Sequence, residues 1–365
     1  MNAQDALLPL TVYGSNISYF TGKLEMYLRT KGIPYRFITL NGRRHMPLLQ
    51  RETGVTQIPA VVLADGRWMT DTTPMIAWLE QQFPFPPLLP DDPEQRFFSL
   101  LLEDYADEWL WRPAMHFRWY GDEGAMHLSR HIAHEIMFDV PLPVWLRSAF
   151  FRRRQRSGFT VGDGVSAANR LQVEAIYHNN LRWLSHVLER RPFLLGNSPS
   201  IVDVGFMGSM FRHFSQDPEP AEIMRRQAPA VWEWVARLWN CGPAAAQADW
   251  LEGVPEDWAP WLEDVGSTYL PYLNANAEAA RAGKKRFTTN AGGVRYVNAR
   301  VSRYRVWCLQ QLRAHFNTLP PQSATRVQQR LRRQGCWEPL WQCEPLDCKV
   351  NRVTTPPFGT DTMML

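Results

Sequence analysis

The chain has no stretch of about 18 uninterrupted apolar residues, which is the length that a membrane-spanning helix needs. Its N-terminus also lacks a basic region followed by an apolar run, so no signal peptide is expected. The hydrophobic residues, 45% of 365, are spread along the chain and can fill two or three buried cores. No internal repeat at a solenoid period is present.

Cysteine is scarce, and its count of five is odd. An odd set that includes Cys241 and Cys308 favours a reducing, cytoplasmic environment over a disulfide framework. Cys336, Cys343 and Cys348 have irregular spacing and no close histidine. We therefore expect no zinc knuckle in this region.

Acidic residues are absent from residues 281–335, which contain thirteen Lys or Arg residues and leave 27 basic against 36 acidic residues elsewhere. Such asymmetry can indicate contact with nucleic acid or an anionic membrane. The alternative is that the basic segment packs across the acidic body or lines a pocket for an anionic substrate. We favour packing, because apolar residues interleave the charges at helical spacing. These residues are Tyr304, Val306, Trp307, Leu309, Leu312 and Phe316.

The first segment contains a proline that opens an apolar strand, at Gln57-Ile58-Pro59. Proline cannot donate to a sheet ladder, so it lies at an edge or a first strand position, where the preceding peptide bond can also be cis. The backbone of Ile58 is then free to pair with an extended peptide. A helix that begins at Asp71-Thr72 offers N–H groups and a hydroxyl to a carboxylate. One small peptide-like ligand can thus be held at both ends.

The remaining periodicity predicts the order β-α-β-α-β-β-α for this segment. The expected elements are a strand over 8–13, a helix over 18–32, a strand over 35–40, a weak helix over 45–52, a hairpin over 60–69 that turns at Asp65-Gly66, and a helix over 72–83. A proline-rich connector over 84–93 marks the domain boundary. Beyond it we expect helices over 94–119, 167–190, 201–214 and 228–239, and a less regular insertion over 120–166 with an Arg152–Arg156 basic cluster.

Three of these features together resemble the glutathione S-transferase superfamily. They are the Ile58-Pro59 step, the Asp71-Thr72 helix start and the helix entry that runs from Ser18 to Lys23. A further match is the capping box Ser200-Ile-Val-Asp203, which the family carries at a buried helix. The resemblance covers roughly residues 8 to 245.

The resemblance implies an α/β thioredoxin-like, glutathione-binding domain over 8–86 and an all-α domain over 93–248. This chain adds a helical extension over 249–350 and a tail over 351–365. The family also implies a homodimer and a role in detoxification. Neither a membrane nor nucleic acid is expected as a partner.

For catalysis, the resemblance places Ser18 where serine-type members hold the hydroxyl that hydrogen-bonds the glutathione sulfur. Lowering a thiol pKa by about two units needs roughly 2.7 kcal/mol, and a hydroxyl at a helix N-terminus supplies part of it. The alternative is that Ser18 is only a helix N-cap. Tyr13 is the second candidate, because tyrosine-type members use a residue near it, and Ser15 is the third.

For binding, the resemblance implies that Ile58, beside Pro59, pairs with the cysteinyl backbone of glutathione. Gln57 would reach the glycyl carboxylate, and Asp71 and Thr72 would hold the γ-glutamyl end. The alternatives are structural, since Pro59 can serve only a turn and Asp71 only a helix cap.

The expected function is therefore transfer of glutathione, ionised by Ser18, to a small electrophile. The competing possibility is a binding or scaffold protein that keeps the fold without turnover. Disulfide exchange is disfavoured because no cysteine stands at position 18. A metal is not expected, although His127, His131, His134 and Glu135 share one face of a possible helix.

Overall fold

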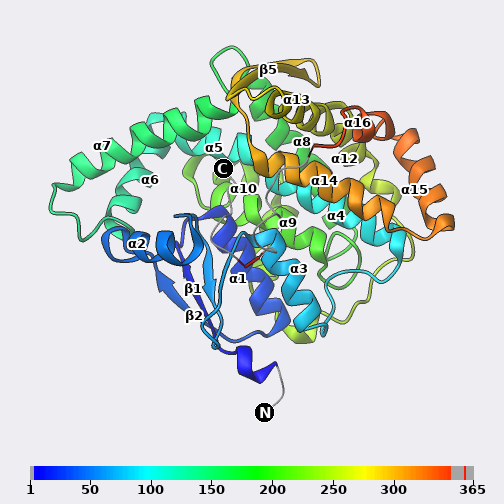
Figure 1. Cartoon of the computed structure of the whole chain (residues 1–365), viewed down its shortest axis with the longest axis horizontal. Coiled ribbons are helices and arrows are strands. Elements are labelled where there is room, and N and C mark those ends of the chain that lie inside the picture. Colours follow the sequence, from blue (N-terminus) through cyan, green and yellow to red (C-terminus); the bar gives the residue numbers. More distant parts are fainter. Residues whose placement is uncertain (1–3, 347–356, 359–365) are drawn as a thin grey trace.

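A computed structural model of the chain describes residues 4–346 and 357–358 (Figure 1). The predicted order of the first domain is confirmed. Its elements are β1 (Leu10–Gly14), α1 (Tyr19–Lys31), β2 (Tyr35–Thr39), α2 (Gly42–Thr53), β3 (Ala60–Val62), β4 (Trp68–Thr70) and α3 (Thr72–Gln82). The helix α1 crosses over between the parallel strands β1 and β2, while β3 runs antiparallel to both β1 and β4. The sheet order is β2-β1-β3-β4.

The two faces of β1 serve two different cores, because side chains alternate along a strand. Leu10 and Val12 are fully buried in the main core together with Leu24 of α1. Tyr13 points to the opposite face, where Ile58 and other apolar residues pack around α2 and a second helical layer. The strand β1 therefore contributes side chains to both cores, and the predicted ligand-binding residue Ile58 packs against the second.

The second domain is helical. Its main helices are α4 (Pro93–Glu108), α5 (Trp111–Trp119), α8 (Arg170–Leu188), α9 (Ile201–Ser209), α10 (Pro218–Gln227) and α11 (Pro229–Trp239). The single helix predicted over 94–119 is wrong, because the chain breaks it at Trp109-Leu110. Both residues are fully buried, so an unbroken apolar pattern concealed the break. The helix predicted over 201–214 is α9 continued by a π-helical turn, Met210–Phe214.

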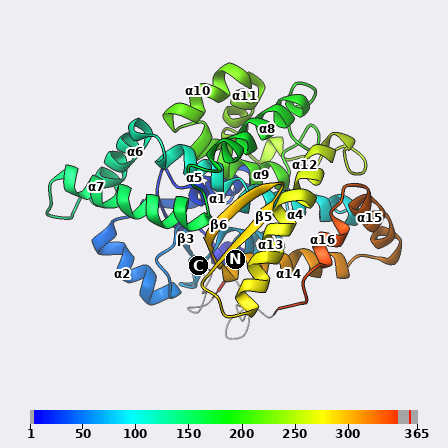
Figure 2. The same ribbon diagram turned by 90° about the horizontal axis from the view of Figure 1, so that it is seen from above.

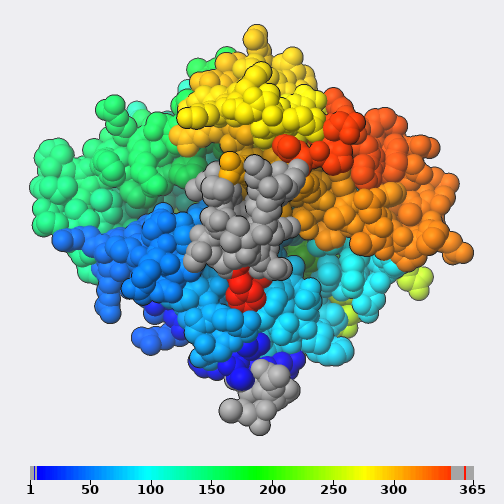
Figure 3. Space-filling model, viewed as in Figure 1, coloured from blue at the N-terminus to red at the C-terminus, as the bar shows by residue number. Residues whose placement is uncertain are grey.

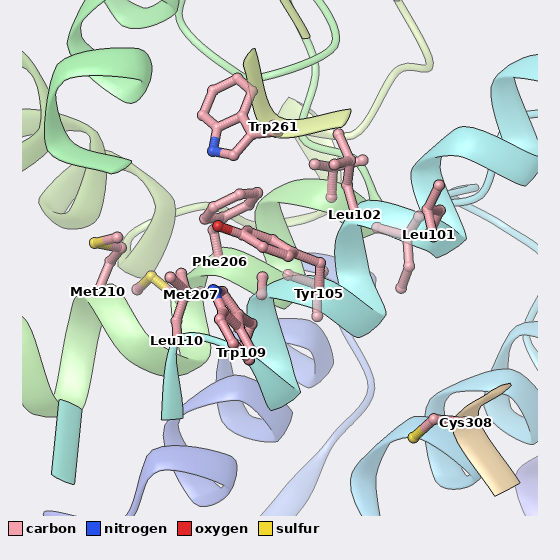
Figure 4. Packing of buried hydrophobic residues seen from close by; sticks show 14 of the residues in the cluster. Leu101, Leu102, Tyr105, Trp109, Leu110, Phe206, Met207, Met210, Trp261 and Cys308 are labelled. Atoms are coloured by element: carbon pink, nitrogen blue, oxygen red, sulfur yellow. The ribbon is translucent and has the colours of Figure 1, made fainter. Parts of the chain in front are cut away.

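The helix α9 is buried along its whole length. Its predicted capping box is present, and Asp203 also accepts hydrogen bonds from Leu194 N and Trp234 Nε1, each 3.0 Å long. Figure 4 shows Phe206 of α9 beside Tyr105 of α4 in this core.

The insertion over 120–166, predicted to be less regular, forms two helices. These are α6 (Asp122–Glu135) and α7 (Val144–Gln155), followed by a π-helical turn, Arg156–Thr160. Together they make a hairpin that projects from the body in two perpendicular views (Figures 1 and 2). The prediction of less regular structure was wrong because α7 buries only Arg147 and Ser148. Its apolar side chains therefore do not mark a buried helix face.

The extension contains α12 (Ala259–Asp264), a π-helical turn (Val265–Tyr269), α13 (Leu270–Arg281), α14 (Arg303–Asn317), α15 (Pro321–Arg333) and α16 (Trp337–Trp341). It also contains a hairpin of β5 (Arg286–Ala291) and β6 (Val294–Arg300), which the helical expectation missed. The turn between them uses Gly292 and Gly293, both with positive φ, and this is a strong hairpin signal. Short 3₁₀ turns occur at Asp5–Leu7, Val161–Asp163, Pro243–Ala245 and Glu256–Trp258.

The basic segment of the extension packs on the body, as predicted. Arg305 of α14 is buried and forms ion pairs with Glu108 and Asp163 at 3.1 and 3.0 Å. Further along, Arg326 pairs with Glu94, and both Arg330 and Arg333 pair with Glu256. Both α14 and α15 contact α4.

In the part of the chain that the structure describes, Cys241, Cys308, Cys336 and Cys343 are buried and form no disulfide. The fifth cysteine, Cys348, lies outside the described residues. Among the helices of residues 4–346, none is long and apolar enough to cross a membrane.

Candidate functional site

Ser18 lies at the N-terminus of α1 as its N-cap. Its Oγ accepts a hydrogen bond from Thr21 N at 3.3 Å, so the capping interpretation is correct. A hydroxyl that accepts an N–H still has its own proton to donate. The partial positive charge of the helix N-terminus also favours an anion at this position. Capping and sulfur activation are therefore compatible roles for one side chain.

Tyr13, the second candidate, packs on the other side of the loop. Its ring stacks on Trp68 at 5.4 Å between centroids and meets His45 edge-on at 5.3 Å. It also lines an open groove of about 740 Å³ with Arg36 of β2 and Arg44 of α2. Ser18, Ile58 and Asp71 are not among the residues that line this groove. Tyr13 and Ser18 therefore face different surroundings.

A carboxylate from the inserted hairpin holds the β1–α1 loop. Glu135, the last residue of α6, accepts hydrogen bonds from Asn16 N at 2.7 Å and from the hydroxyl of Ser15 at 3.1 Å. The hydroxyl of Ser15, the third candidate, is thus committed to Glu135. The sequence considered Glu135 only with nearby histidines, because its real partners are 119 and 120 residues away.

Two buried arginines of the helical domain hold the carbonyl groups of the same loop. Arg118 donates to Ile17 O at 2.7 Å, and Arg212 donates to Asn16 O. Arg118 is paired with Asp217 at 2.7 Å, and Arg212 with Glu25 at 2.9 Å. The helical domain therefore fixes the loop in position before any ligand binds.

The Ile58–Pro59 peptide bond is cis, in line with the sequence. The ladder of β3 begins only at Ala60, which pairs with Tyr13 and Thr70. Within the described residues, the backbone N–H and C=O of Ile58 make no hydrogen bond. Ile58 and Gln57 are both half-buried, so this backbone is reachable by an extended ligand.

Asp71 has a backbone conformation that L-amino acids rarely adopt, with φ of 69° and ψ of 122°. Its side chain makes no N-cap hydrogen bond of ordinary geometry, although the backbone N–H of Thr73 lies near enough to lower the pKa of the carboxyl. Such backbone strain is concentrated at functional sites. Burial and the negative charge of Glu108 raise the pKa of Asp71 to about 7, while Lys23 opposes the rise. Thr72, the first residue of α3, is buried.

A buried ionic network lies beside Asp71. The ammonium group of Lys23 contacts the carboxylates of Glu103 and Asp107, and it donates to Thr73 Oγ1 at 3.3 Å. Burial alone would lower the pKa of Lys23, but Asp107 and Glu103 raise it well above its ordinary value. Lys23 therefore stays charged in the interior.

The extension reaches this network, which the sequence did not predict. Tyr304 of α14 lies near enough to Asp71 to lower the pKa of its carboxyl. At the edge of β4, Pro357 O accepts from Thr70 N at 3.1 Å, and Phe358 bridges to Met69. These two tail residues lie in red among side chains of the first domain in Figure 3. The far end of the chain thus borders the start of α3.

The possible metal ligands on α6 do not form a cluster. His131 Nε2 lies 3.3 Å from Glu135 Oε2, but the carboxylate is bound to the loop. Among the described residues, no three His, Cys, Asp or Glu side chains are arranged to hold a metal ion.

The fold defines a class of protein, in which a four-stranded thioredoxin-like domain precedes an all-helical domain. Residues 12–87 match the profile of the "Glutathione S-transferase, N-terminal domain", and residues 167–237 match that of the "Glutathione S-transferase, C-terminal domain". The chain belongs to the glutathione S-transferase superfamily.

Individual relatives are distant. The isoprene-epoxide–glutathione S-transferase of a Rhodococcus species is 24% identical over 222 residues, which are 58% of this chain and 88% of that protein. Glutathione S-transferase U8 of Arabidopsis thaliana is 29% identical over 111 residues, or 30% of this chain and 48% of that one. A solved glutathione S-transferase from Methylobacterium radiotolerans, in complex with glutathione sulfonate, is 18% identical with a TM-score of 0.43, covering 68% of this chain and 98% of that chain.

Proposed function

We propose that this protein binds glutathione along the backbone of Ile58 and transfers it, as a thiolate, to a small electrophile. The observation that carries the proposal is the free N–H and C=O of Ile58 beside the cis proline. An extended peptide can add to these groups as a short strand. Glutathione is a peptide of suitable length to reach from there to the N-terminus of α3.

Each predicted residue then has a role. Ile58 pairs with the cysteinyl backbone, and Gln57 reaches the glycyl carboxylate. Asp71 and Thr72 hold the γ-glutamyl end. The hydroxyl of Ser18 donates to the sulfur, which lowers the thiol pKa so that the thiolate attacks the electrophilic carbon.

The electrophile would lie against an aromatic wall next to Ser18. Phe20 of α1 stacks on Trp111 of α5 at 5.6 Å, and Phe159 meets the Trp111 ring edge-on at 5.7 Å. All three side chains are only half-buried. Such a wall suits a small apolar substrate. The name of the Rhodococcus relative includes an isoprene epoxide, so small apolar epoxides are the first substrates to test.

Binding is tested by the melting temperature in millimolar glutathione, which must rise if the native state binds the ligand. Asp71→Asn keeps a side chain that tolerates a positive φ but removes the charge, and it should reduce the rise. Asp65→Asn, on the exposed β3–β4 turn, is the matched control and should leave the rise unchanged. The absence of any rise in the unmodified protein would refute the proposal.

A binding protein without turnover is the second candidate. It is favoured by the nearness of Tyr304 to Asp71, because α14 then occupies space beside the γ-glutamyl position. A thiol-conjugation assay at saturating glutathione separates the two candidates. A rise in melting temperature with no conjugation of any apolar epoxide would favour the binding protein.

The homodimer and the domain limits remain predictions. Since α14 and α15 cover part of α4, a dimer must use another face of the molecule. Sedimentation velocity over a range of concentrations measures this directly. Residence in the cytoplasm, expected from the cysteine count, and a role in detoxification, implied by the family, are proposals.

A further inference from the structure

Many of the exposed apolar side chains among the described residues lie on the α6–α7 hairpin, residues 122–155. Of the twelve large hydrophobic residues that are exposed in the described chain, six lie in this hairpin. They are Met126, Phe138, Leu142, Trp145, Leu146 and Phe150. The hairpin lies at one edge of the molecule, against the first domain, in Figure 3. Isolated exposed apolar residues are ordinary, but a contiguous group marks an interaction surface.

Three of these residues form a stripe along α7. Trp145, Leu146 and Phe150 are 68%, 38% and 63% exposed, and their spacing places them on one side of the helix. The opposite side packs on α6 through buried Ser148, whose hydroxyl is 2.7 Å from that of Ser129. The packed side of α7 carries Ser148 and the half-buried Phe151, while the exposed side carries three large apolar residues that an ordinary surface helix would bury.

Positively charged side chains follow the apolar stripe toward the end of α7. The helix Val144–Gln155 contains four arginines and no acidic residue. Arg153 and Arg154 near its end are exposed, and neither forms an ion pair within the described residues. The loop before α7 adds exposed Phe138 and Leu142 at the tip of the hairpin.

We propose that the α7 stripe and the hairpin tip dock on a membrane surface that contains anionic lipids. Tryptophan, leucine and phenylalanine enter the boundary between headgroups and acyl chains, while arginines at the helix end meet lipid phosphates. No spanning helix is needed. A second copy fits less well, because two α7 helices facing each other bring together arginines and no carboxylate.

This inference changes the expectation that no membrane is a partner, which rested on the absence of a spanning segment. It does not depend on the proposed glutathione chemistry.

The test is co-sedimentation of the full chain with vesicles of phosphatidylcholine, with and without phosphatidylglycerol. Binding should need the anionic lipid and should weaken as salt rises. Trp145→Ser with Phe150→Ser should lower the partition coefficient at least about tenfold, since aromatic burial drives insertion. Arg153→Gln with Arg154→Gln should lower it by about thirtyfold, since each lost charge weakens binding by about 1 kcal/mol.

Leu171→Ser on α8 is the control, because this residue is equally exposed, at 65%, but lies outside the hairpin. Its partitioning should equal that of the unmodified protein. Unchanged melting temperatures would show that all variants fold, since every altered side chain is exposed. Failure to bind anionic vesicles, or binding that the Trp145 and Phe150 changes leave intact, would overturn the proposal. Self-association abolished by those changes, without vesicle binding, would assign the face to a second copy instead.

Discussion

At the scale of the residue, Ser18 shows how a structural role and a chemical role can share one side chain. The hydroxyl accepts from Thr21 N and so closes the first turn of α1. Its proton remains available at the positive end of the helix. The sequence alone treated the two roles as alternatives, but they are compatible.

We predict that Ser18→Ala slows conjugation by about 10- to 100-fold, because the thiol pKa of bound glutathione rises by about one to two units. Glutathione affinity should change by less than about threefold, since the peptide contacts lie elsewhere. Loss of the cap should also reduce the free energy of unfolding by about 1 kcal/mol. The measurements are the pH dependence of conjugation and a glutathione titration.

Ser18→Thr keeps the hydroxyl and should retain most activity, whereas Tyr13→Phe should have no effect. A large loss in Tyr13→Phe together with normal activity in Ser18→Ala would transfer the role to Tyr13.

Asp104 of α4 carries a second prediction at this scale. Burial raises its pKa to about 7, although a hydrogen bond from Tyr269, 2.7 Å long, opposes the rise. In the unfolded chain the pKa of an aspartate is about 3.9. Between these values the native state binds more protons than the unfolded state, so the contribution of Asp104 to stability falls as the pH rises from about 4 to 7.

Asp104→Asn removes this dependence and should therefore stabilise the protein more at pH 8 than at pH 5, relative to the unmodified chain. Urea unfolding at the two pH values measures the difference. Asp91→Asn, which is fully exposed at the start of the second domain, should show none. An equal effect of Asp104→Asn at both pH values would contradict the raised pKa.

At the scale of the element, α4 and α9 pack closely against each other inside the helical domain. Gly205 permits this contact, because a Cβ atom there would lie 2.8 Å from the Cα atom of Glu103. Backbone at such a distance cannot move aside as the end of a flexible side chain can. The same two helices carry Glu103 and the Asp203 capping box, so their spacing also positions the ionic network beside Asp71.

We predict that Gly205→Ala lowers the free energy of unfolding by about 1–3 kcal/mol, as overpacking does in cores. Gly158→Ala is the control, because no atom lies within 4 Å of its added Cβ. It should change stability by no more than about 0.5 kcal/mol. Denaturant unfolding of both variants gives the comparison, and equal stabilities would show that α4 and α9 separate without cost.

At the scale of the whole molecule, the extension forms part of the helical core. Trp258, Trp261 and Leu262 are buried in the same core as α4 and α9. Arg305 brings a compensating charge to Glu108 and Asp163. Removing the extension would leave apolar surface and buried carboxylates without their partners.

We predict that a chain truncated after Gly253 is insoluble or unfolded, whereas the full chain binds nucleic acid only weakly. Expression of the truncated chain and a gel-shift titration of the full chain at two salt concentrations test both statements. Tight binding of DNA or RNA that falls steeply with salt would contradict the packed interpretation of residues 281–335, because each neutralised phosphate releases counterions.

Features that depend on neighbouring residues were determined by the sequence itself. The Ser18 cap, the left-handed Gly32 that ends α1 and the Ser200–Asp203 box each join residues at most four positions apart, and backbone geometry fixes what they do. The order of elements in the first domain followed for the same reason, since the hairpin turn and the α1 crossover are local, whereas the pairing of β1 with β3 is not. The α7 helix was missed because its apolar side faces outward.

Only the tertiary structure decided which distant groups meet. Glu135 holds Asn16 across 119 residues, Arg212 holds the same loop across 196, and Tyr304 reaches Asp71 from the extension. No local pattern specifies such pairs, because they depend on how separately formed units dock and on which charges that docking buries. The sequence therefore determined the residues available for chemistry, and the packing of the helical domain and extension decided their surroundings.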